Sequence, residues 1–491
     1  MLRYLIAIIA GGLMPLAFSP FGFYPVAIFS LAVLFYLCLG TSSAKSFKIG
    51  LLYGLGYFTI GISWLQISIH QFGLPVLAFS ISMTILFILL IALFPAFTTY
   101  FTERFFNHSY KQKLLIIYPA FWVIFEWIRS WLFTGFPWLT VGYSQIDSPL
   151  LGIGSVTGIY GISFFVAMTA GALVLLVKKR QSVIILFLAV VIPVWTGSYF
   201  LKNTEWTKAV GEEIKVAIVQ GNIAQEIKWL PQQKQITLDL YNKLSEPFWD
   251  ESDLIIWPET ALPAFMHDIP DFMNSLGDRA KKSSTDIMLG LPTLDPTTGR
   301  YYNSMVSLGD ETHIYHKQHL VPFGEYLPLK KWIDPILKFL QIPMSNFSKG
   351  ESKKNLIETT KYSIGISVCY EDVFGEEVIT GLPEADFLIN VSNDAWFGDS
   401  LAPHQHLEMA RMRAFETGRY LIRSTNTGIS AIINQKGQVT NLAPQFEQTT
   451  LLANILAYEG LTPYARTGNM PIIIFCFLLL ALSAIRERGE T

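Results

Sequence analysis

The stretch Ile364-Gly-Ile-Ser-Val-Cys-Tyr-Glu-Asp372 is an apolar run with strand character that ends in one cysteine and two acids. Cys369 is the one cysteine outside the long apolar segments, because Cys38 and Cys476 lie within them. The spacing of the three suggests neither a disulfide nor a zinc site. A thiol at a strand end, followed by Glu371, is a candidate nucleophile, although a lone cysteine is more often a small buried hydrophobic residue. Its interpretation depends on what other chemistry the chain supplies.

The composition divides the chain into apolar and mixed parts. Of 491 residues, 51% are hydrophobic and only 15% are charged, which is too apolar for an ordinary soluble enzyme. We therefore expect a membrane domain over 1–201, a globular domain over 202–465, and a final span with a short tail over 466–491. The net charge of −2 gives no electrostatic reason to expect nucleic acid as a partner.

Apolar runs long enough to cross about 30 Å of hydrocarbon, about 20 residues each, occur at eight positions. They are 3–19, 23–40, 49–69, 75–98, 114–134, 158–177, 183–201 and 470–485. The basic residues Arg3, Lys45, Lys48, Arg104, Lys111, Lys113, Lys178, Lys179, Arg180, Arg486 and Arg488 all fall on one side of this eight-span arrangement. The alternate loops 19–22, 70–74 and 135–157 contain neither Lys nor Arg. By the positive-inside rule, both termini are cytoplasmic and the globular domain is extracytoplasmic.

One predicted span carries charge near its outer end. Glu126 and Arg129 are three residues apart and share one helix face. An ionisable pair at that depth is a candidate functional site, but a self-neutralising pair that only packs spans together explains it equally well.

Short β-rich runs alternate with helical patterns in the globular domain. Strands are expected at 216–220, 253–257, 287–290, 302–308, 312–316, 364–368, 387–391, 420–424 and 429–434, and helices at 232–245, 272–282, 331–339 and 404–417. This alternation predicts a layered α/β fold with a buried sheet, in which active groups lie on loops at strand ends.

Two other strand ends supply groups that a cysteine nucleophile needs. Trp257-Pro-Glu259-Thr ends one strand with a carboxylate, and His316-Lys317 begins a stretch that includes a second acid, Glu325. Each alone has an ordinary explanation, as a helix N-terminal acid or a solvated loop charge. Together with Cys369 they provide a base for the thiol proton, a cation for a tetrahedral oxyanion, and a nucleophile for acyl transfer.

At these residues the sequence resembles the nitrilase superfamily and, within it, the apolipoprotein N-acyltransferase family. The motifs that carry the resemblance are Gln220-Gly-Asn-Ile223 with Lys228-Trp229, Trp257-Pro-Glu-Thr260, His319-Leu-Val-Pro-Phe-Gly-Glu-Tyr-Leu-Pro328, Cys369-Tyr-Glu371 and Asn393-Asp-Ala-Trp-Phe-Gly398. The resemblance covers essentially the whole chain. It implies an α-helical membrane domain of eight spans that carries one αββα sandwich with a Glu-Lys-Cys triad.

The resemblance also implies a role for particular residues. Glu259 is the general base, Lys317 the oxyanion-stabilising cation and Cys369 the nucleophile. Glu325, Tyr370 and Glu371 are supporting residues. The positions expected to bind substrate are Trp229, Asn303, Trp138 and Trp396. No cofactor is implied, and His404 with His406 gives no metal site because no third ligand has a suitable spacing.

The implied reaction moves an acyl chain from a membrane phospholipid, through a Cys369 thioester, to the N-terminal amino group of a diacylglyceryl-cysteine lipoprotein. The implied setting is a bacterial inner membrane, with the catalytic domain on the periplasmic side of the lipid bilayer and a monomeric enzyme. One alternative is a membrane-tethered amidase or nitrile hydrolase with the same triad, in which water takes the acyl group. Another is a non-catalytic membrane scaffold, which the filled triad positions disfavour.

The segment Leu340-Gln-Ile-Pro-Met-Ser-Asn-Phe-Ser348 is expected to be a membrane-facing lid. Ile342, Met344 and Phe347 are apolar, the segment has no charge, and the polar run 349–354 with its three lysines follows. Such a loop is suited to dip into a membrane interface, although its apolar residues can equally return to the core of the domain.

The one-sided basic residues predict the accessibility of the globular domain. In a Cys369→Ala background, a cysteine introduced by Gln232→Cys should react with a charged, membrane-impermeant thiol reagent added from outside the inner membrane. Labelling only after lysis would place the domain on the cytoplasmic side and invert the model.

Overall fold

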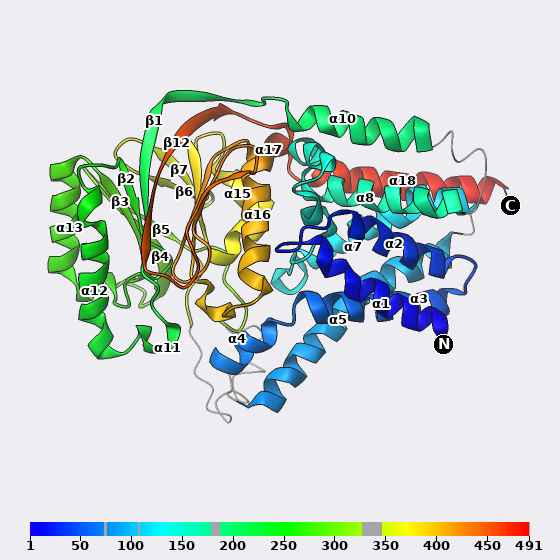
Figure 1. Ribbon diagram of the computed structural model, residues 1–491, viewed down its shortest axis with the longest axis horizontal. Coiled ribbons are helices and arrows are strands. Elements are labelled where there is room, and N and C mark those ends of the chain that lie inside the picture. The colour runs from blue at the N-terminus through cyan, green and yellow to red at the C-terminus, as the bar shows by residue number, and fades with distance from the viewer. Residues whose placement is uncertain (73–75, 107–108, 178–186, 327–345, 491) are drawn as a thin grey trace. The chain divides into compact units, whose positions relative to one another are not determined.

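The computed structural model describes residues 1–72, 76–106, 109–177, 187–326 and 346–490, and the contacts of the chain divide it into two units (Figure 1). The helical unit comprises Met1–His70, Pro75–Glu205 and Thr462–Thr491. The sandwich unit comprises Gln71–Leu74 and Trp206–Leu461.

The helical unit consists of α-helices joined by short 3-10 or π turns. The α-helices are α1 (Leu2–Leu13), α2 (Pro25–Cys38), α3 (Ser43–Gly61), α4 (Leu65–Phe72), α5 (Leu77–Phe105), α6 (Tyr110–Gln112), α7 (Tyr118–Arg129), α8 (Gly154–Val177), α10 (Ile192–Lys202), α17 (Pro463–Thr467) and α18 (Met470–Glu490). The turns are η1 (Met14–Ala17), η2 (Lys113–Ile117), η3 (Leu132–Thr134), η4 (Val141–Gln145), η5 (Pro149–Ile153) and η6 (Phe187–Val191).

Among the described residues, two stretches of helix are long and apolar enough to cross a membrane, namely α5 and Pro149–Val177, which contains α8. The pair α3 and α4, bent by 58°, is a third if both belong to one span. The helices within 2–17, 25–38 and 470–486 are apolar but shorter. These apolar helices support the conclusion that the chain is a membrane protein, whereas the count of eight spans stays a prediction. Part of the expected span 183–201 lies outside the described residues.

Helix α5 shows most clearly why this unit belongs in lipid. Its most apolar window has a mean hydropathy of 2.7, yet only 28% of that window is buried. The exposed side chains include Ile81, Ile85, Leu86, Leu89 and Leu90. A face of this kind is costly in water and stable in hydrocarbon, where the helix satisfies its own backbone hydrogen bonds.

The charged pair in α7 fastens the loop that follows the helix. Arg129 Nη1 donates to the carbonyl oxygens of Phe136 and Trp138, both at 2.6 Å. Glu126 Oε1 accepts from the N–H of Val141 at 2.8 Å. These contacts favour the packing interpretation of the pair over a functional one.

The sandwich unit contains two six-stranded sheets. The strands are β1 (Thr207–Gln220), β2 (Leu254–Ile256), β3 (Asp286–Leu294), β4 (Tyr301–Leu308), β5 (Thr312–His316), β6 (Leu356–Glu358), β7 (Ser363–Val368), β8 (Phe387–Ser392), β9 (Leu421–Thr425), β10 (Ala431–Ile433), β11 (Val439–Leu442) and β12 (Thr449–Gly460). Their orders are β12-β1-β2-β3-β4-β5 and β11-β10-β9-β8-β7-β6. In each sheet three central strands are parallel, β1-β2-β3 and β7-β8-β9, and the flanking pairs are antiparallel.

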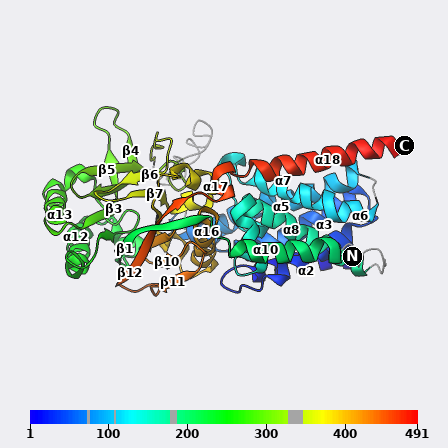
Figure 2. The ribbon, with the colours of Figure 1, turned by 90° about the horizontal axis from the view of Figure 1, so that it is seen from above.

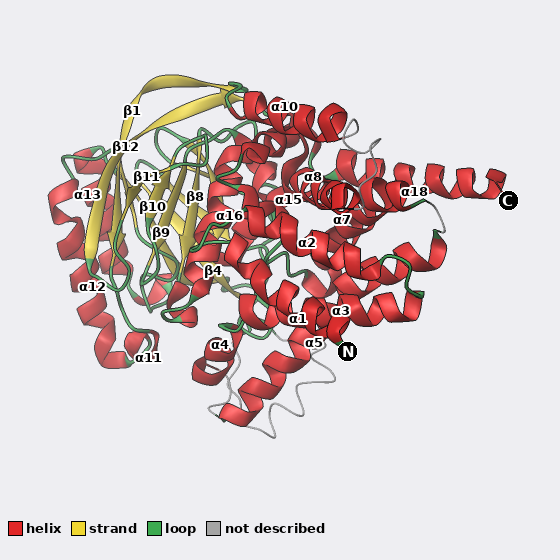
Figure 3. Cartoon of the chain, turned by 45° about the vertical axis from the view of Figure 1, so that its right-hand side comes forward, coloured by secondary structure: helices red, strands yellow, loops and turns green. Residues whose placement is uncertain are grey.

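Helices cover the outer face of each sheet, so the layers follow the order α, β, β, α (Figures 2 and 3). The α-helices of the unit are α11 (Gln225–Lys228), α12 (Pro231–Ser245), α13 (Pro270–Ser283), α15 (Gly375–Val378) and α16 (Leu401–Thr417), and the 3-10 turns are η7 (Glu246–Phe248), η8 (Met266–Asp268), η9 (Cys369–Val373), η10 (Ile379–Gly381) and η11 (Asp394–Phe397). The expected sandwich of two sheets is therefore present.

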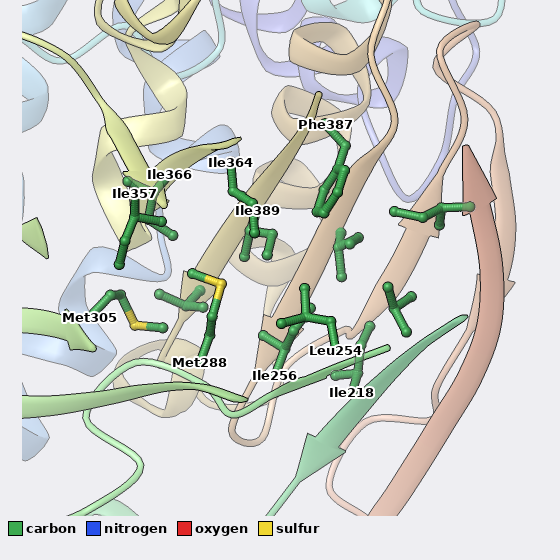
Figure 4. Close-up of a cluster of buried hydrophobic side chains, with 14 of the residues drawn as sticks. Ile218, Leu254, Ile256, Met288, Met305, Ile357, Ile364, Ile366, Phe387 and Ile389 are labelled. Carbon is green, nitrogen blue, oxygen red and sulfur yellow. The ribbon is translucent and has the colours of Figure 1, made fainter. Parts of the chain in front are cut away.

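The core between the sheets is built from β-branched and long apolar side chains of the facing strands. It includes Ile218, Leu254, Ile256, Met288 and Met305 from one sheet and Ile357, Ile364, Ile366, Phe387 and Ile389 from the other (Figure 4). Because side chains alternate between the two faces of a strand, the neighbouring positions fill the outer layers against the helices.

The largest departure from the expected elements is the long ribbon of β1 and β12. Only 216–220 was expected as a strand, yet β1 begins at Thr207 and pairs antiparallel with β12 from Thr207↔Gly460 to Gln220↔Thr449. The outer half of β1 is mostly exposed and carries Lys208, Glu212 and Glu213, so no apolar alternation marks it. The expected helix 331–339 lies outside the described residues.

The position of Glu259 depends on a glycine in the neighbouring strand. A Cβ on Gly290 would lie 2.5 Å from the carbonyl oxygen of Pro258 and 2.8 Å from Cα of Glu259. Gly290→Ala should therefore destabilise the protein by about 1–3 kcal/mol, measured as a lower thermal midpoint in detergent. Gly277→Ala is the matched control, because nothing lies within 4 Å of its Cβ in α13, and it should raise stability by about 0.5–1 kcal/mol. If Gly290→Ala and wild type have equal thermal midpoints, the backbone of residues 258–260 moves aside without a cost in free energy.

Candidate active site

Three strand ends of the sandwich unit each present one of the expected triad residues. Glu259 lies three residues beyond β2, Lys317 follows β5, and Cys369 follows β7. Their side chains are buried, since Glu259, Lys317 and Cys369 are 6%, 1% and 9% exposed. Functional groups held at strand ends are positioned by the hydrogen-bonded sheets behind them.

The ammonium of Lys317 lies between two carboxylates. Its Nζ is 3.3 Å from Glu259 Oε1 and 3.0 Å from the carboxylate of Glu325. Burial acts to lower the pKa of Lys317, but the negative charges of Glu259 and Glu325 outweigh it and raise that pKa above its ordinary value. Lys317 is therefore a fixed cation over the whole working pH range.

Two asparagines fix the orientation of Glu259. Asn303 Nδ2 donates to Glu259 Oε1 at 2.8 Å and to Glu325 Oε1 at 2.9 Å. The N–H of Asn393 donates to Glu259 Oε2 at 2.9 Å. Both oxygens of the carboxylate are thus held, which keeps the group in one place for proton transfer.

Cys369 occupies a backbone conformation that favours glycine. Its φ is 54°, and a left-handed residue with a side chain costs roughly 1–3 kcal/mol unless the surroundings enforce it. Burial and the charge of Glu259 raise the pKa of the Cys369 thiol well above its usual range, and the charge of Lys317 acts against them. The resting thiol is therefore protonated, so the expected role of Cys369 as a nucleophile requires a base that removes this proton.

Glu371 joins the nucleophile's strand to the loop that carries Lys317. Its Oε2 accepts from the N–H of Val368 at 2.7 Å, and its Oε1 accepts from the N–H groups of Gln318 at 2.6 Å and His319 at 3.1 Å. The hydroxyl of Tyr315 is 3.1 Å from each oxygen. Burial raises the pKa of Glu371 to about 7, although these N–H groups and the charge of Lys317 lower it.

The remaining expected residues of the sandwich unit are Tyr370, Trp229 and Trp396. Tyr370 packs its ring edge-on against His319 and Phe374, at centroid distances of 5.8 and 5.1 Å. Trp229 follows α11 and is 50% exposed, and Trp396 in η11 is partly buried.

Trp138 belongs to the other unit of the chain. It is buried in the helical unit against Trp64, with ring centroids 5.1 Å apart. The structure thus brings Glu325, Asn303 and Glu371 to the triad, whereas substrate contacts by the three tryptophans stay predictions. Of the expected lid, residues 340–345 lie outside the described part of the chain.

A buried charge network behind the nucleophile was not expected from the sequence. His406 Nε2 is 2.7 Å from Asp372 Oδ1, and its Nδ1 is 3.3 Å from Asp394 Oδ1. Arg423 Nη2 is 2.8 Å from Asp394 Oδ2. His406 is therefore part of an ion-pair network, and among the described residues no group of three His, Cys, Asp or Glu side chains could hold a metal.

This network reaches the backbone of the nucleophile through Asn390. Arg423 donates to Asn390 Oδ1, and Asn390 Nδ2 donates to the carbonyl oxygen of Cys369 at 3.2 Å. Asp372 lies in the same short turn as Cys369. The sequence signal for this support was an asparagine within the apolar strand β8, because a polar side chain in a buried strand needs a partner.

Two family models match the chain. The apolipoprotein N-acyltransferase N-terminal domain matches residues 10–172, and the carbon-nitrogen hydrolase domain matches residues 215–464. An apolipoprotein N-acyltransferase of Methylococcus capsulatus is 42% identical over 488 residues, which cover 99% of this chain and 96% of that protein. One of Haemophilus influenzae is 39% identical over 497 residues, covering 98% and 94%. A solved carbon-nitrogen hydrolase superfamily protein of Xanthomonas campestris is 18% identical, covers 50% of this chain and 91% of its own, and has a TM-score of 0.37.

Proposed function

The chain belongs to the apolipoprotein N-acyltransferase family, and we propose that it carries an acyl chain from a membrane phospholipid through Cys369 to the N-terminal amino group of a diacylglyceryl-cysteine lipoprotein. It is an acyltransferase and a membrane protein of lipoprotein maturation, with lipoproteins and phospholipids as substrates in general. The observation that supports the mechanism most is the buried Lys317 ammonium, held between Glu259 and Glu325 beside a protonated thiol.

In the first half-reaction, Cys369 Sγ attacks the ester carbonyl carbon of the phospholipid while Glu259 takes the thiol proton. The carbonyl oxygen becomes an oxyanion, which the Lys317 ammonium stabilises. Collapse breaks the C–O bond, and the protonated Glu259 gives its proton to the departing alkoxide. The products are a lysophospholipid and a thioester on Cys369.

In the second half-reaction, the free amine of the lipoprotein attacks the thioester carbon. Glu259 accepts a proton from the attacking nitrogen, and Lys317 again faces the oxyanion. Collapse breaks the C–S bond, and the proton on Glu259 returns to the Cys369 thiolate. No external energy source is required, because an amide is more stable than a thioester.

The burial of the triad supports aminolysis over hydrolysis. The amidase or nitrile hydrolase alternative needs water at the thioester, whereas Glu259, Lys317 and Cys369 are at most 9% exposed. A site that excludes water leaves the thioester to the amine. The similarity of the whole chain to apolipoprotein N-acyltransferases also disfavours the alternative.

The finer placement in the membrane is part of the proposal. We infer eight spans, domain limits at 1–201, 202–465 and 466–491, cytoplasmic termini, and a catalytic domain on the periplasmic side of a bacterial inner membrane. The positions of the basic residues support this orientation. A monomer is sufficient, because Glu259, Lys317 and Cys369 all come from one chain.

The proposed function predicts a covalent intermediate. Purified protein incubated with a diacyl phospholipid and no amine acceptor should gain the mass of one acyl chain, located at Cys369 by peptide mass spectrometry. A diacylglyceryl-cysteine peptide should then remove the adduct and gain the acyl group as an amide. Cys369→Ala should show no adduct, and Cys38→Ala is the matched control that should behave as wild type. An adduct that water removes as fast as the peptide does would support the hydrolase instead.

The role of Lys317 predicts a large effect of a charge-conserving substitution. Lys317→Arg should lower the rate of acyl transfer roughly 100- to 1,000-fold, because a planar guanidinium cannot replace a compact ammonium between two carboxylates and facing one oxyanion. The exposed Lys361, paired with Asp253, offers the matched control Lys361→Arg, which should leave the rate unchanged. Near-normal turnover of Lys317→Arg would remove the lysine from the mechanism.

A further inference from the structure

A second buried lysine lies close to the triad and is not used by the mechanism above. Lys228 ends the short helix α11 and is 1% exposed, as buried as Lys317. Among the residues that the structure describes, no atom accepts a hydrogen bond from its Nζ. Lys228 is therefore an amine without a partner in the interior of the sandwich unit.

Hydrogen bonds connect the face of α11 that carries Lys228 to the catalytic base. Gln225 is three residues before Lys228 and so lies on the same face of the helix. Gln225 Oε1 accepts from Asn393 Nδ2 at 2.8 Å, and the N–H of Asn393 donates to Glu259 Oε2 at 2.9 Å. Burial lowers the pKa of Lys228 to about 8, and the charge of Glu259 acts against that fall. The amine is thus within the electrostatic reach of the site.

The unpaired amine lowers the stability of the protein. A buried polar group without a hydrogen bond costs roughly 1–3 kcal/mol, and an apolar side chain of the same shape at this position would avoid that cost. Lys317 shows that the same fold can pair a buried ammonium with two carboxylates. The vacant donors of Lys228 are therefore suited to a ligand that brings its own acceptor oxygens.

The residues on either side of Lys228 indicate which ligand that is. Ile227 and Trp229, the sequence neighbours of Lys228, are 42% and 50% exposed, so apolar surface side chains flank the buried lysine along the chain. Exposed apolar side chains next to a buried cation in the chain suit a molecule with hydrocarbon chains and an anionic group. A phospholipid has both, whereas the N-terminal amine of the acceptor carries no anion next to the reacting atom.

We propose that Lys228 is a donor-specificity residue that binds the phosphate of the acyl-donating phospholipid while its ester carbonyl lies at Cys369. This inference rests on the proposed function and adds a subsite to it. The ammonium donates hydrogen bonds to the phosphate oxygens and is paired only while the donor is bound. After the lysophospholipid leaves, Lys228 is unpaired again and makes no contribution to the binding of the amine acceptor.

The test compares two donors that differ only in the phosphate-bearing headgroup. Wild type and Lys228→Met are incubated in detergent micelles with dioleoylphosphatidylglycerol or with dioleoylglycerol, and acylation of Cys369 is followed by intact mass. For the variant, the second-order rate constant of Cys369 acylation by the phospholipid should fall roughly 10- to 100-fold, the usual effect of losing a charge-assisted hydrogen bond. Its rate constant of acylation by dioleoylglycerol should stay within about threefold of wild type, and its thermal midpoint should be equal or higher.

Lys243→Met, on the exposed face of α12, is the matched control and should leave both donors unaffected. An equal loss of acylation rate with both donors would make Lys228 a positioning residue for the triad. A loss of rate only in the step that transfers the acyl group to a peptide amine would make Lys228 a proton acceptor. Either result overturns the proposal, as does an unchanged phospholipid reaction. Strong competition by millimolar inorganic phosphate in wild type would instead indicate a site for free phosphate. If wild type forms no adduct with either donor, the proposed function itself fails.

Discussion

The catalytic centre depends on one electrostatic constraint, which is that the buried ammonium of Lys317 must be paired. Removing a cation from water costs several kcal/mol, and only close carboxylates in good geometry offset that cost. Glu259 and Glu325 meet the ammonium at 3.3 and 3.0 Å, and Asn303 donates to both carboxylates from the next strand. The pairing fixes the proposed base, Glu259, and the proposed oxyanion-stabilising cation, Lys317, together, so neither has to reorganise during the proposed reaction.

The nucleophile is held by a different set of contacts. The Glu371 carboxylate accepts hydrogen bonds from the N–H of Val368, at the end of β7, and from the N–H of Gln318, in the loop after β5. The strand that leads to Cys369 therefore cannot move independently of the loop that carries Lys317. Asn390 Nδ2 donates a hydrogen bond to the carbonyl oxygen of Cys369. Hydrogen bonds on both sides of Cys369 in the chain help to offset the cost of its positive φ of 54°.

Much of the sandwich unit could be predicted from the sequence because its central strands are continuous apolar runs that end in polar residues. The same logic placed Glu259, Lys317 and Cys369 at strand ends, and family resemblance supplied their roles. Sequence analysis did not predict β12, because the exposed residues of this strand break the apolar alternation. It also did not predict the ion-pair partners of Arg423, because these residues lie far from Arg423 in the chain. Hydropathy located the apolar runs of the helical unit, but the bend between α3 and α4 arises from local backbone geometry that composition does not encode.

Within the described part of the sandwich unit, Lys317 and Lys228 are both buried lysines, yet their environments suit them to opposite roles. Lys317 is paired in the resting protein, so the charges of Glu259 and Glu325 outweigh its burial and keep it a cation, which in the proposed mechanism acts on an oxyanion formed only during the reaction. Lys228 is unpaired, so burial lowers its pKa and leaves its donors vacant. A permanent ion pair gives no discrimination between ligands, because its electrostatic interactions are satisfied before any ligand arrives. An unpaired donor discriminates strongly, because a ligand without an acceptor leaves it unsatisfied. In the proposed mechanism, selection of the acyl donor therefore belongs with Lys228, and acceleration of the chemical step belongs with Lys317.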